Sequence, residues 1–539
     1  MNYKVKVSHV ALWITVTLAV GIVLGILLSP STRNAADIIS PRASGNTKID
    51  HVLQLINSKY VDPIDYDSLV DNTIVAMLEK LDPHSVYIPA SNFAEEQESM
   101  QGNFEGIGIM YRMDEDTVCV IQAIEGGPSK KAGIMAGDKI ITVNDSIIAG
   151  KGLSTEQIMS KLKGKKGTRV RVGIKRSGVP KLLKFGVTRD VIPTYSVVYH
   201  GMLDKRTGYI RLTKFSATSY AEFVLALSEL KDEGMKNLIL DLRDNSGGLL
   251  DQAIGIADEL LPGREMIVYT QDRNGRKSKS YSHKGGVFSE GNLLVMIDEF
   301  SASASEIVAG AVQDNDRGII VGRRSFGKGL VQEQIELPDQ SALRLTVARY
   351  YTPSGRCIQR PYEKGSDEYY ADFLLRLTAE LSDSINYVSK QDTVKYYTTS
   401  GRVVYGGGGI LPDVIYHLPK DTTYRCYNTL VDKGLVQKYA FDYNDRNRKS
   451  LLRKYPTADD FVNDFTVAGE MLDVFLQYAN NQGVVCSRKA LKGHDKELSV
   501  LLKANIAELL FNEEAFYKVY LGMDTEVVRS LKLINRKAD

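Results

Sequence analysis

The sequence predicts a multidomain protein of the α+β and α/β classes, because its local patterns change character several times along the 539 residues. Helical periodicity fills the N-terminal part, and glycine-punctuated β-rich runs follow it. Strand and helix patterns then alternate, and the C-terminal part is helical again. The hydrophobic fraction of 43% and the charged fraction of 25% are those of a globular chain that buries a core.

Charge and cysteine content exclude several classes of function. Lys and Arg number 68 and Asp and Glu number 66, so the net charge of +2 gives no basis for nucleic acid as a partner. Four scattered cysteines without a CxxC pair argue against a disulfide scaffold and a cysteine zinc site. No two of the seven histidines have the spacing of zinc ligands. We therefore expect no metal and no cofactor.

An uncharged run of 19 residues, Val10–Leu28, lies near the start of the chain. As a helix that rises about 1.5 Å per residue, it just spans the hydrocarbon core of a bilayer. Lys4 and Lys6 precede the run and predict a cytoplasmic N-terminus. We predict that residues 1–30 form an uncleaved, single-pass signal anchor in the cytoplasmic (inner) membrane, with the rest of the chain in the periplasm. A cleaved signal peptide is the alternative.

Two segments precede the β-rich region. Residues 31–47 are small and polar, which is typical of a linker. Residues 48–92 carry apolar side chains at three- and four-residue spacing, which predicts a helical N-terminal region. That region ends in LDPHSVYIP, Leu81–Pro89, because proline does not continue a helix.

Residues 93–190 contain the phrases FEGIGIMY, Phe104–Tyr111, and GGPSKKAGIMAGDKIITVND, Gly126–Asp145. Together they resemble a PDZ domain of the bacterial protease type. The resemblance implies a Gly-x-Gly loop that turns backbone N–H groups toward the terminal carboxylate of a peptide, which adds as a strand. The loop residues are Gly106, Ile107, Gly108 and Ile109.

Residues 191–362 alternate between strand and helix patterns, which indicates an α/β core. One phrase in it, Gly322–Lys328, matches the phosphate-loop pattern G-x-x-x-x-G-K. Gly329 stands where that loop needs Ser or Thr, and the following LVQEQIEL alternates like a strand. We therefore predict no nucleotide site there.

The remaining segments are defined by an internal echo. Residues 363–394 form a charged, helix-prone insert between the similar phrases YYTPSGRC and YYTTSGRV. Residues 395–419 are predicted to return to the core, and residues 420–539 are predicted to form a C-terminal helical domain. The sequence leaves open whether the insert and the tail hold a homo-oligomer together or contact a partner.

Three core segments lie at predicted strand ends or helix starts, where α/β sheets place their active sites. They are DLRDNSGG at Asp241–Gly248, FSASASEIVAGAVQD at Phe300–Asp314, and SFGKGLVQ at Ser325–Gln332. Together with LDPHS and the PDZ-like region, they resemble the C-terminal processing proteases, a family of PDZ-containing Ser–Lys peptidases, over about residues 48–418. The resemblance implies a ClpP/crotonase-like α/β protease core.

The resemblance also assigns roles to side chains. It makes Ser303 the nucleophile, Lys328 the general base and Gln332 the residue that orients the lysine, with Glu306 in a supporting position. Lysine acts as a base only when neutral, so its pKa has to fall by about 3 units from about 10.4, and burial lowers it. Residues i and i+4 of a strand share a face, so Gln332 is expected to reach the amine of Lys328. Because its amide is neutral, it can hold the amine without favouring the charged form.

A tetrahedral oxyanion needs fixed N–H donors. Ser303 heads a predicted helix, so the N–H of Ala304 is one expected donor. The second is expected from Gly247 or Gly248, and the sequence does not decide between them. The rival nucleophiles are Ser301 and Ser305.

These inferences predict a membrane-anchored serine endopeptidase that cleaves extracytoplasmic proteins. Its PDZ domain is expected to recognise polypeptide substrates by their free, unstructured C-termini. A non-catalytic PDZ scaffold is the first alternative, and the joint presence of Ser303, Lys328 and Gln332 argues against it. An acyl-thioester enzyme on the same type of sheet is the second, and a periplasmic site disfavours it.

Overall fold

The computed structural model describes residues 47–114, 116–124, 126–381, 394–417, 424–491 and 493–536. The predicted anchor, residues 1–30, lies outside these residues. Within the described ranges, no helix combines the length and the apolar character that crossing a bilayer requires. The chain divides into a first unit that ends at Thr73 and a second unit that begins at Ile74.

The first unit contains α2 (Thr47–Lys59) and the start of α3 (Tyr66–Leu78). The carboxylate of Asp65 accepts the backbone N–H of Ser68 at 3.2 Å. This bond satisfies one of the free donors at the N-terminus of α3. Both helices fall in the region where the sequence predicts helices.

The second unit continues from α3 into the LDPHS segment, which leads into β1 (Val86–Ile88) and α4 (Ala90–Gln101). Strand β1 pairs antiparallel with β18 (Ala342–Tyr351). The predicted helical region 48–92 therefore includes one strand. This strand forms because a distant core strand offers it hydrogen-bonding partners, which local periodicity does not reveal.

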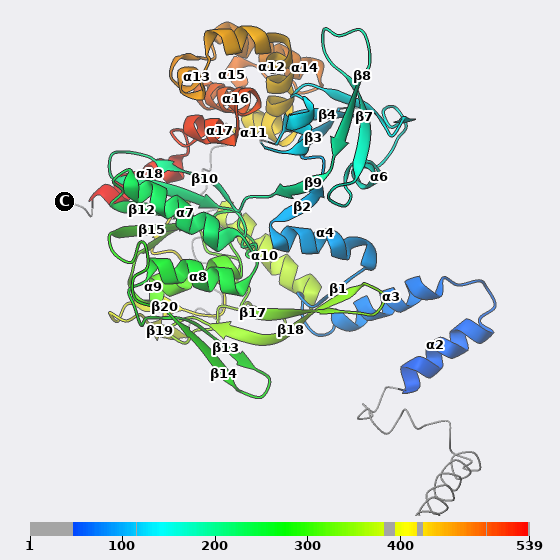
Figure 1. The fold of residues 1–539 in the computed structure, drawn as a ribbon. Helices are drawn as coiled ribbons and strands as arrows, with labels where there is room; N and C mark the ends of the chain where they lie inside the picture. Colours follow the sequence, from blue (N-terminus) through cyan, green and yellow to red (C-terminus); the bar gives the residue numbers. More distant parts are fainter. Residues whose placement is uncertain are drawn as a thin grey trace, which may run out of the picture. The chain divides into compact units, whose positions relative to one another are not determined.

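A β-module with two short helices follows (Figure 1). Its elements are β2 (Asn103–Gly106), β3 (Ile109–Asp114), β4 (Thr117–Ala123), α5 (Pro128–Ala132), β5 (Lys139–Val143), β6 (Ser146–Ile147), α6 (Thr155–Leu162), β7 (Arg169–Lys175), β8 (Leu183–Thr188) and β9 (Asp190–Pro193). The sheet has the order β3-β4-β5-β7-β8, and β2 pairs with β9. Strand β3 is thus an edge strand. A reciprocal capping pair between Ser154 and Gln157, at 3.3 and 3.0 Å, starts α6.

The core is an α/β unit around a six-stranded sheet. Its elements are β10 (Val197–Met202), β11 (Thr207–Leu212), α7 (Ser219–Asp232), β12 (Asn237–Asp241), α8 (Leu250–Leu260), β15 (Asn292–Ile297), α9 (Ala304–Asp314), β16 (Ile319–Gly322) and β21 (Val414–Ile415). The order is β10-β11-β12-β15-β16-β21. All neighbours from β11 onward are parallel, and β10 is an antiparallel edge strand.

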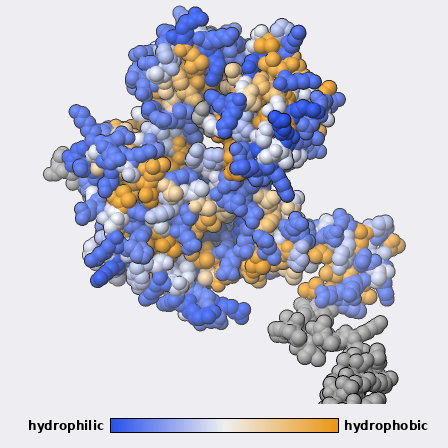
Figure 2. All heavy atoms as spheres, in the orientation of Figure 1, coloured by the Kyte–Doolittle hydropathy of each residue, from blue (hydrophilic) through white to orange (hydrophobic). Residues whose placement is uncertain are grey.

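Helices cover both faces of this sheet (Figure 1). Leu238 and Leu240 of β12 pack into the cluster formed with α7, α8 and α9. Ile239 points to the other face, into a cluster with α18 (Thr525–Arg536). Burial on two faces explains why the core strands read as continuous apolar runs. On the outer surface, apolar side chains gather in patches among hydrophilic ones, and one patch lies over α7 (Figure 2).

A second sheet lies beside the first in the fold (Figure 1). It adds β13 (Met266–Asp272), β14 (Lys277–Tyr281) and β17 (Leu330–Glu336) to β1 and β18. The strand predicted after the phosphate-loop-like phrase is thus present as β17. The insert contains α10 (Ser366–Leu381), and β19 (Lys395–Tyr397) and β20 (Val403–Tyr405) form a hairpin after it. The pairing of β21 with β16 then returns the chain to the core sheet.

The C-terminal part is helical. It contains α11 (Arg425–Asp432), α12 (Leu435–Lys454), α13 (Ala458–Asp464), α14 (Gly469–Asn481), α15 (Arg488–Leu491), α16 (Asp495–Leu510) and α17 (Glu513–Tyr520) before α18. These helices also contact the β-module. The guanidinium of Arg112 on β3 lies 3.9 Å from the ring centroid of Phe441 and 3.6 Å from the carboxylate of Asp442.

A disulfide joins Cys426 of α11 to Cys486, which follows α14, at a sequence separation of 60. The sequence argues against a disulfide scaffold, and this one cross-link in the C-terminal helices is a feature that it did not predict. The two cysteines meet because α11 and the end of α14 pack together around one apolar cluster, and cysteine spacing does not reveal this. Cys119 and Cys357 are free.

We expect reduction of Cys426–Cys486 to destabilise the C-terminal helices. A cross-link that closes a loop of 60 residues removes about 4 kcal/mol of loop-closure entropy from the unfolded chain. Reductant should lower the temperature at which this region melts and becomes protease-sensitive in the full chain. A Cys426→Ser/Cys486→Ser variant should melt at that lower temperature with or without reductant. An equal effect of reductant on both proteins would contradict the expectation.

Candidate active site

A cavity of about 620 Å³ lies between the loops that follow β12 and β15 and the strands β17 and β18. This is the carboxyl end of the parallel strands, where α/β sheets bind ligands. Its lining includes six of the residues that the sequence singles out. They are Gly247, Gly248, Ser303, Ala304, Lys328 and Gln332.

Ser303 is the N-cap residue of α9, with φ 54° and ψ −110°. A non-glycine residue rarely adopts this conformation, and such backbone strain concentrates at functional sites. The hydroxyls of Ser301 and Ser305 are buried and donate to the carbonyl oxygens of Leu242 and Asn245, both at 2.8 Å. Of the three serines, Ser303 is the one that lines the cavity.

Glu306 is fully buried behind Ser303. Its carboxylate accepts four hydrogen bonds, from the N–H groups of Ser303 (2.8 Å), Gly327 (2.7 Å) and Lys328 (2.9 Å) and from the hydroxyl of Ser325 (2.5 Å). Burial raises the pKa of Glu306 to about 7, and these hydrogen bonds act in the opposite direction. Glu306 thus connects the turn that carries the serine to the loop that carries the lysine.

The lysine loop is packed closely against its neighbours. Gly327 has φ +92°, and a Cβ there would stand 2.6 Å from Cγ of Arg360. Glycine therefore permits both the left-handed backbone and the close approach. The hydroxyl of Tyr350 donates to the carbonyl oxygens of Ser303 (3.1 Å) and Lys328 (2.5 Å). This one tyrosine therefore bridges the two loops.

The amine of Lys328 is held in surroundings that disfavour its charge. Burial, together with the positive charge of Arg344, lowers the pKa of Lys328 to about 8. Asp82 and Glu306 act in the opposite direction. Lys328 has no acid among its sequence neighbours, so both carboxylates reach it only through the tertiary fold.

Lys328 Nζ donates to Gln332 Oε1 at 2.8 Å. The amide nitrogen of Gln332 donates in turn to the carbonyl oxygen of His84. The two side chains do not meet through simple strand alternation, because Lys328 precedes β17 and a register shift separates Val331 from Gln332. Burial and the nearby Lys328 lower the pKa of His84 to about 4, so its ring adds no charge beside the amine.

The two glycines differ in their backbone hydrogen bonds. The N–H of Gly247 donates to Oδ1 of Asn245 at 2.9 Å. A Cβ on Gly247 would stand 2.8 Å from Cβ of Ser303, so this glycine permits the approach of the two loops. Gly248 is exposed to the cavity, and a Cβ on it would clash with the carbonyl oxygen of Phe215. Within the described loops, neither the N–H of Gly248 nor that of Ala304, the first residue of α9, donates a hydrogen bond.

The predicted carboxylate loop of the β-module lies between β2 and β3. Gly106 ends β2, and Ile109 opens the edge strand β3. The side chain of Ile107 is buried in the core of the module, and its carbonyl oxygen accepts the N–H of Ser129 at 3.0 Å. Gly108 has φ +69°, which lets the chain turn into β3.

Several residues at the site carry no local signal in the sequence. Asn245 and Tyr350 hold the loops through hydrogen bonds, and Arg344 acts through charge. Asp82 and His84 belong to the LDPHS phrase, which is part of the family resemblance and was the one available signal. The contact of His84 with Gln332 follows from the pairing of β1 with β18.

A network of charged side chains connects the loops that follow β12 and β16 to the start of the C-terminal helix α18. Arg243, in the loop after β12, bonds to Asp524 (2.8 Å) and Glu526 (2.9 Å) at the start of α18. Arg323, which follows β16, also bonds to Glu526, and it reaches Glu299 at 2.6 Å. Glu526 therefore ties together the loops that follow two strands of the sheet.

Family models match four stretches of the chain. The model described as "Peptidase family S41" matches residues 206–365, and the model described as "PDZ domain" matches residues 106–187. The model described as "Activating protease CtpB N-terminal domain" matches residues 29–91. A family of unknown function matches residues 426–512, which span α11 to α16.

Curated relatives agree with these models. The "Carboxy-terminal-processing protease" of Bartonella bacilliformis is 37% identical over 347 residues, which cover 62% of this chain and 79% of the relative. The chain belongs to the carboxy-terminal processing protease family. Within that family, CtpA and CtpB of Bacillus subtilis are 34% and 33% identical, over 59% and 60% of this chain and 68% and 67% of theirs. The protein is therefore a serine peptidase of family S41 with a PDZ domain.

We expect Glu526→Gln to lower both the stability and the activity of the processing protease, because it loosens the loops that carry Arg243 and Arg323. The change removes a carboxylate that two buried guanidinium groups share, at a cost on the order of 2 kcal/mol of stability. Melting temperature and kcat should both fall, because Arg243 and Arg323 lose a common partner. Lys532→Gln, an exposed change on the same helix, is the matched control. An unchanged melting temperature in Glu526→Gln would contradict the role of the network.

Proposed function

We propose that this processing protease is a membrane-anchored endopeptidase of the periplasm that cuts proteins near their free C-terminal tails, with Ser303 as nucleophile and Lys328 as general base. The observation that carries the proposal is the environment of Lys328. Its amine is buried, its pKa is lowered to about 8, and it bonds to the neutral amide of Gln332 in a cavity that Ser303 also lines.

The reaction follows from these positions. Ser303 Oγ attacks the scissile carbonyl carbon, and its proton moves to Lys328 Nζ. Gln332 Oε1 accepts a hydrogen bond from the resulting ammonium. The ammonium returns a proton to the leaving amine as the C–N bond breaks, which leaves an ester on Ser303. Water then gives a proton to the same amine as it attacks the ester carbonyl carbon, and the ammonium returns that proton to Ser303 Oγ as the ester C–O bond breaks and the new carboxyl terminus leaves.

The oxyanion of each tetrahedral intermediate needs two donors. We assign them to the N–H groups of Ala304 and Gly248. Ala304 opens α9, where backbone N–H groups have no partner within the helix. Gly248 is preferred to Gly247 because the N–H of Gly247 is already donated to Asn245. Glu306 supports the site by fixing the backbone of Ser303.

The PDZ domain is proposed to recognise the substrate's terminal carboxylate through the loop of Gly106, Ile107, Gly108 and Ile109. Two observations support this role. The loop leads into β3, whose outer edge has no strand partner among the described residues, and an extended peptide adds to such an edge. Arg112 on β3 also contacts the C-terminal helices, so tail binding and those helices meet at one strand.

Periplasmic placement is proposed from the uncharged run Val10–Leu28 and the lysines before it. The disulfide between Cys426 and Cys486 supports it, because disulfides persist in oxidising compartments such as the periplasm.

We expect Ser303→Ala and Lys328→Ala to abolish cleavage. The assay is release of the C-terminal fragment from a protein substrate with an unstructured tail, followed by mass spectrometry. Lys364→Ala, at an exposed lysine of the insert region, is the control and should cleave as the wild type does. Undiminished cleavage by either of the first two variants would overturn the assignment.

The pH dependence of the reaction tests the lysine directly. Because the base has to be neutral and its pKa is about 8, kcat/KM should rise with pH up to about 8 and then level off. Gln332→Glu places a carboxylate beside the amine and should move this limb to higher pH. Gln332→Ala removes orientation without adding charge, so it should lower kcat with a smaller shift of the limb. A limb that Gln332→Glu leaves in place would contradict the role of Lys328.

A further inference from the structure

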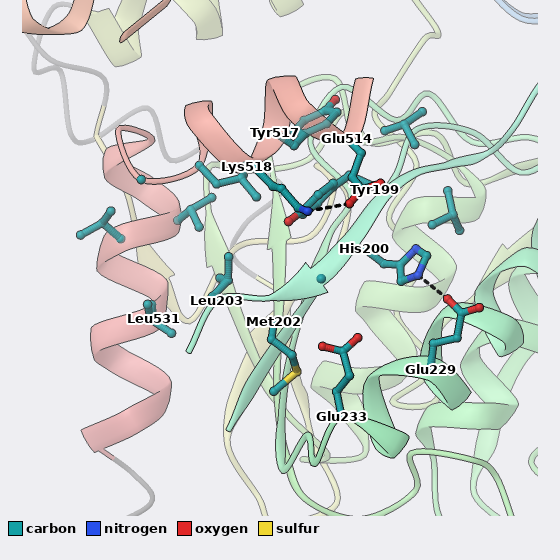
Figure 3. Close-up of a pocket in the computed structure, with 17 residues that line it drawn as sticks. Tyr199, His200, Met202, Leu203, Glu229, Glu233, Glu514, Tyr517, Lys518 and Leu531 are labelled. Carbon is teal, nitrogen blue, oxygen red and sulfur yellow. Dashed lines mark hydrogen bonds and ion pairs between the residues drawn. The ribbon is translucent and has the colours of Figure 1, made fainter. Parts of the chain in front are cut away.

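A second cavity lies on the core (Figure 3). Its volume is about 820 Å³, and β10 runs along it from Val197 to Leu203. One wall is the C-terminal end of α7, and the other is formed by α17 and the first turns of α18. The two cavities have no lining residue in common.

Strand β10 presents an open edge to this groove. It is the end strand of the core sheet, and in the described part of the chain only β11 pairs with it. The N–H of Leu203 donates to the carbonyl oxygen of Thr207 at 2.8 Å. Because antiparallel bonds alternate along a strand, the backbone groups of His200 and Met202 then face outward. An open edge of this kind is a template for another strand.

The two faces of β10 meet different chemistry. Tyr199 stacks on Tyr517, with ring centroids 5.2 Å apart, and Leu203 packs against the same apolar cluster. His200 points to the opposite side, where its ring bonds to Glu229 at 2.6 Å (Figure 3). Glu233 stands on the same wall as Glu229. A strand added to this edge would therefore alternate between an apolar face and an acidic face.

The charges in the groove favour a basic occupant. Three carboxylates line it, those of Glu229, Glu233 and Glu514, against one lysine, Lys518. Lys518 is already paired with Glu514 at 2.9 Å and with Asp459 at 3.0 Å. The acidic excess thus lies on the wall formed by α7.

We propose that the edge of β10 is a docking site for an extended segment of a partner polypeptide in which lysine or arginine alternates with apolar residues. The segment pairs with β10 through its backbone, places its apolar side chains toward α17 and α18, and places its basic side chains toward Glu229 and Glu233. Strand addition of this type draws affinity from main-chain bonds and specificity from alternate side chains. The proposal goes beyond the peptidase reaction and does not depend on it.

The test uses the full-length chain in detergent with Ser303→Ala, so that the probe is not cut. The probe is a fluorescent peptide of alternating lysine and valine with an amidated C-terminus, which offers the PDZ loop no carboxylate. Fluorescence anisotropy measures its binding. A peptide of alternating glutamate and valine is the charge control, and we expect it not to bind.

Two matched comparisons separate the parts of the proposal. Glu233→Lys should weaken binding of the lysine–valine peptide by about tenfold, whereas Asp232→Lys, the same change beside it but off the groove, should leave binding unchanged. N-methylation of alternate amides in the probe tests the backbone pairing. Methyl groups on the amides that face β10 should abolish binding, and methyl groups on the other set should not.

Three results would overturn the proposal. The first is absence of binding by the lysine–valine peptide, and the second is equal behaviour of the two N-methylated series or of the two charge variants. The third is a stable dimer of the chain that Glu233→Lys leaves intact while no peptide binds, which would assign this edge to a second copy. Melting temperatures of both charge variants confirm that they are folded.

Discussion

In the proposed mechanism, the structure around the active site depends on one constraint, which is that the amine of Lys328 has to lose its proton near neutral pH. Burial lowers the pKa of Lys328 to about 8. A carboxylate bonded to the amine would raise that pKa again, so the amine needs an uncharged partner. The partner of the amine is instead the neutral amide of Gln332. The amide is held by the carbonyl of His84, whose own ring stays neutral. The N-terminal LDPHS segment thus holds, through the carbonyl of His84, the side chain that we propose orients the lysine.

Glu306 holds the two loops of the site in position relative to each other. The serine turn and the lysine loop come from different strands, and their backbones have to stay in register with each other. One buried carboxylate accepts donors from both loops, and Tyr350 bonds to both carbonyls. Because the N–H groups of Gly327 and Lys328 take up the carboxylate oxygens, its charge is held by backbone and not by the lysine amine.

The C-terminal helices connect these local arrangements to the rest of the chain. Helix α18 packs on the face of the sheet opposite α7, α8 and α9 and fixes Arg243 and Arg323 through Glu526. Helix α12 contacts the PDZ strand β3 through Phe441. Helices α17 and α18 wall the groove along β10. A region without a recognisable motif therefore touches the loops near the active site, the peptide-binding module and the proposed partner surface of the core.

The sequence by itself determined the family, the order of the domains and most core strands. Buried parallel strands show in it as apolar runs, and the Gly-rich and Ser-rich segments after them show as short motifs. It also singled out Ser303, Lys328 and Gln332. Only the tertiary structure showed that the hydroxyls of Ser301 and Ser305 are bonded elsewhere, that the N–H of Gly247 is taken by Asn245, and that Cys426 pairs with Cys486. These distinctions rest on hydrogen bonds and contacts between residues far apart in the chain, and periodicity and spacing carry no information about them.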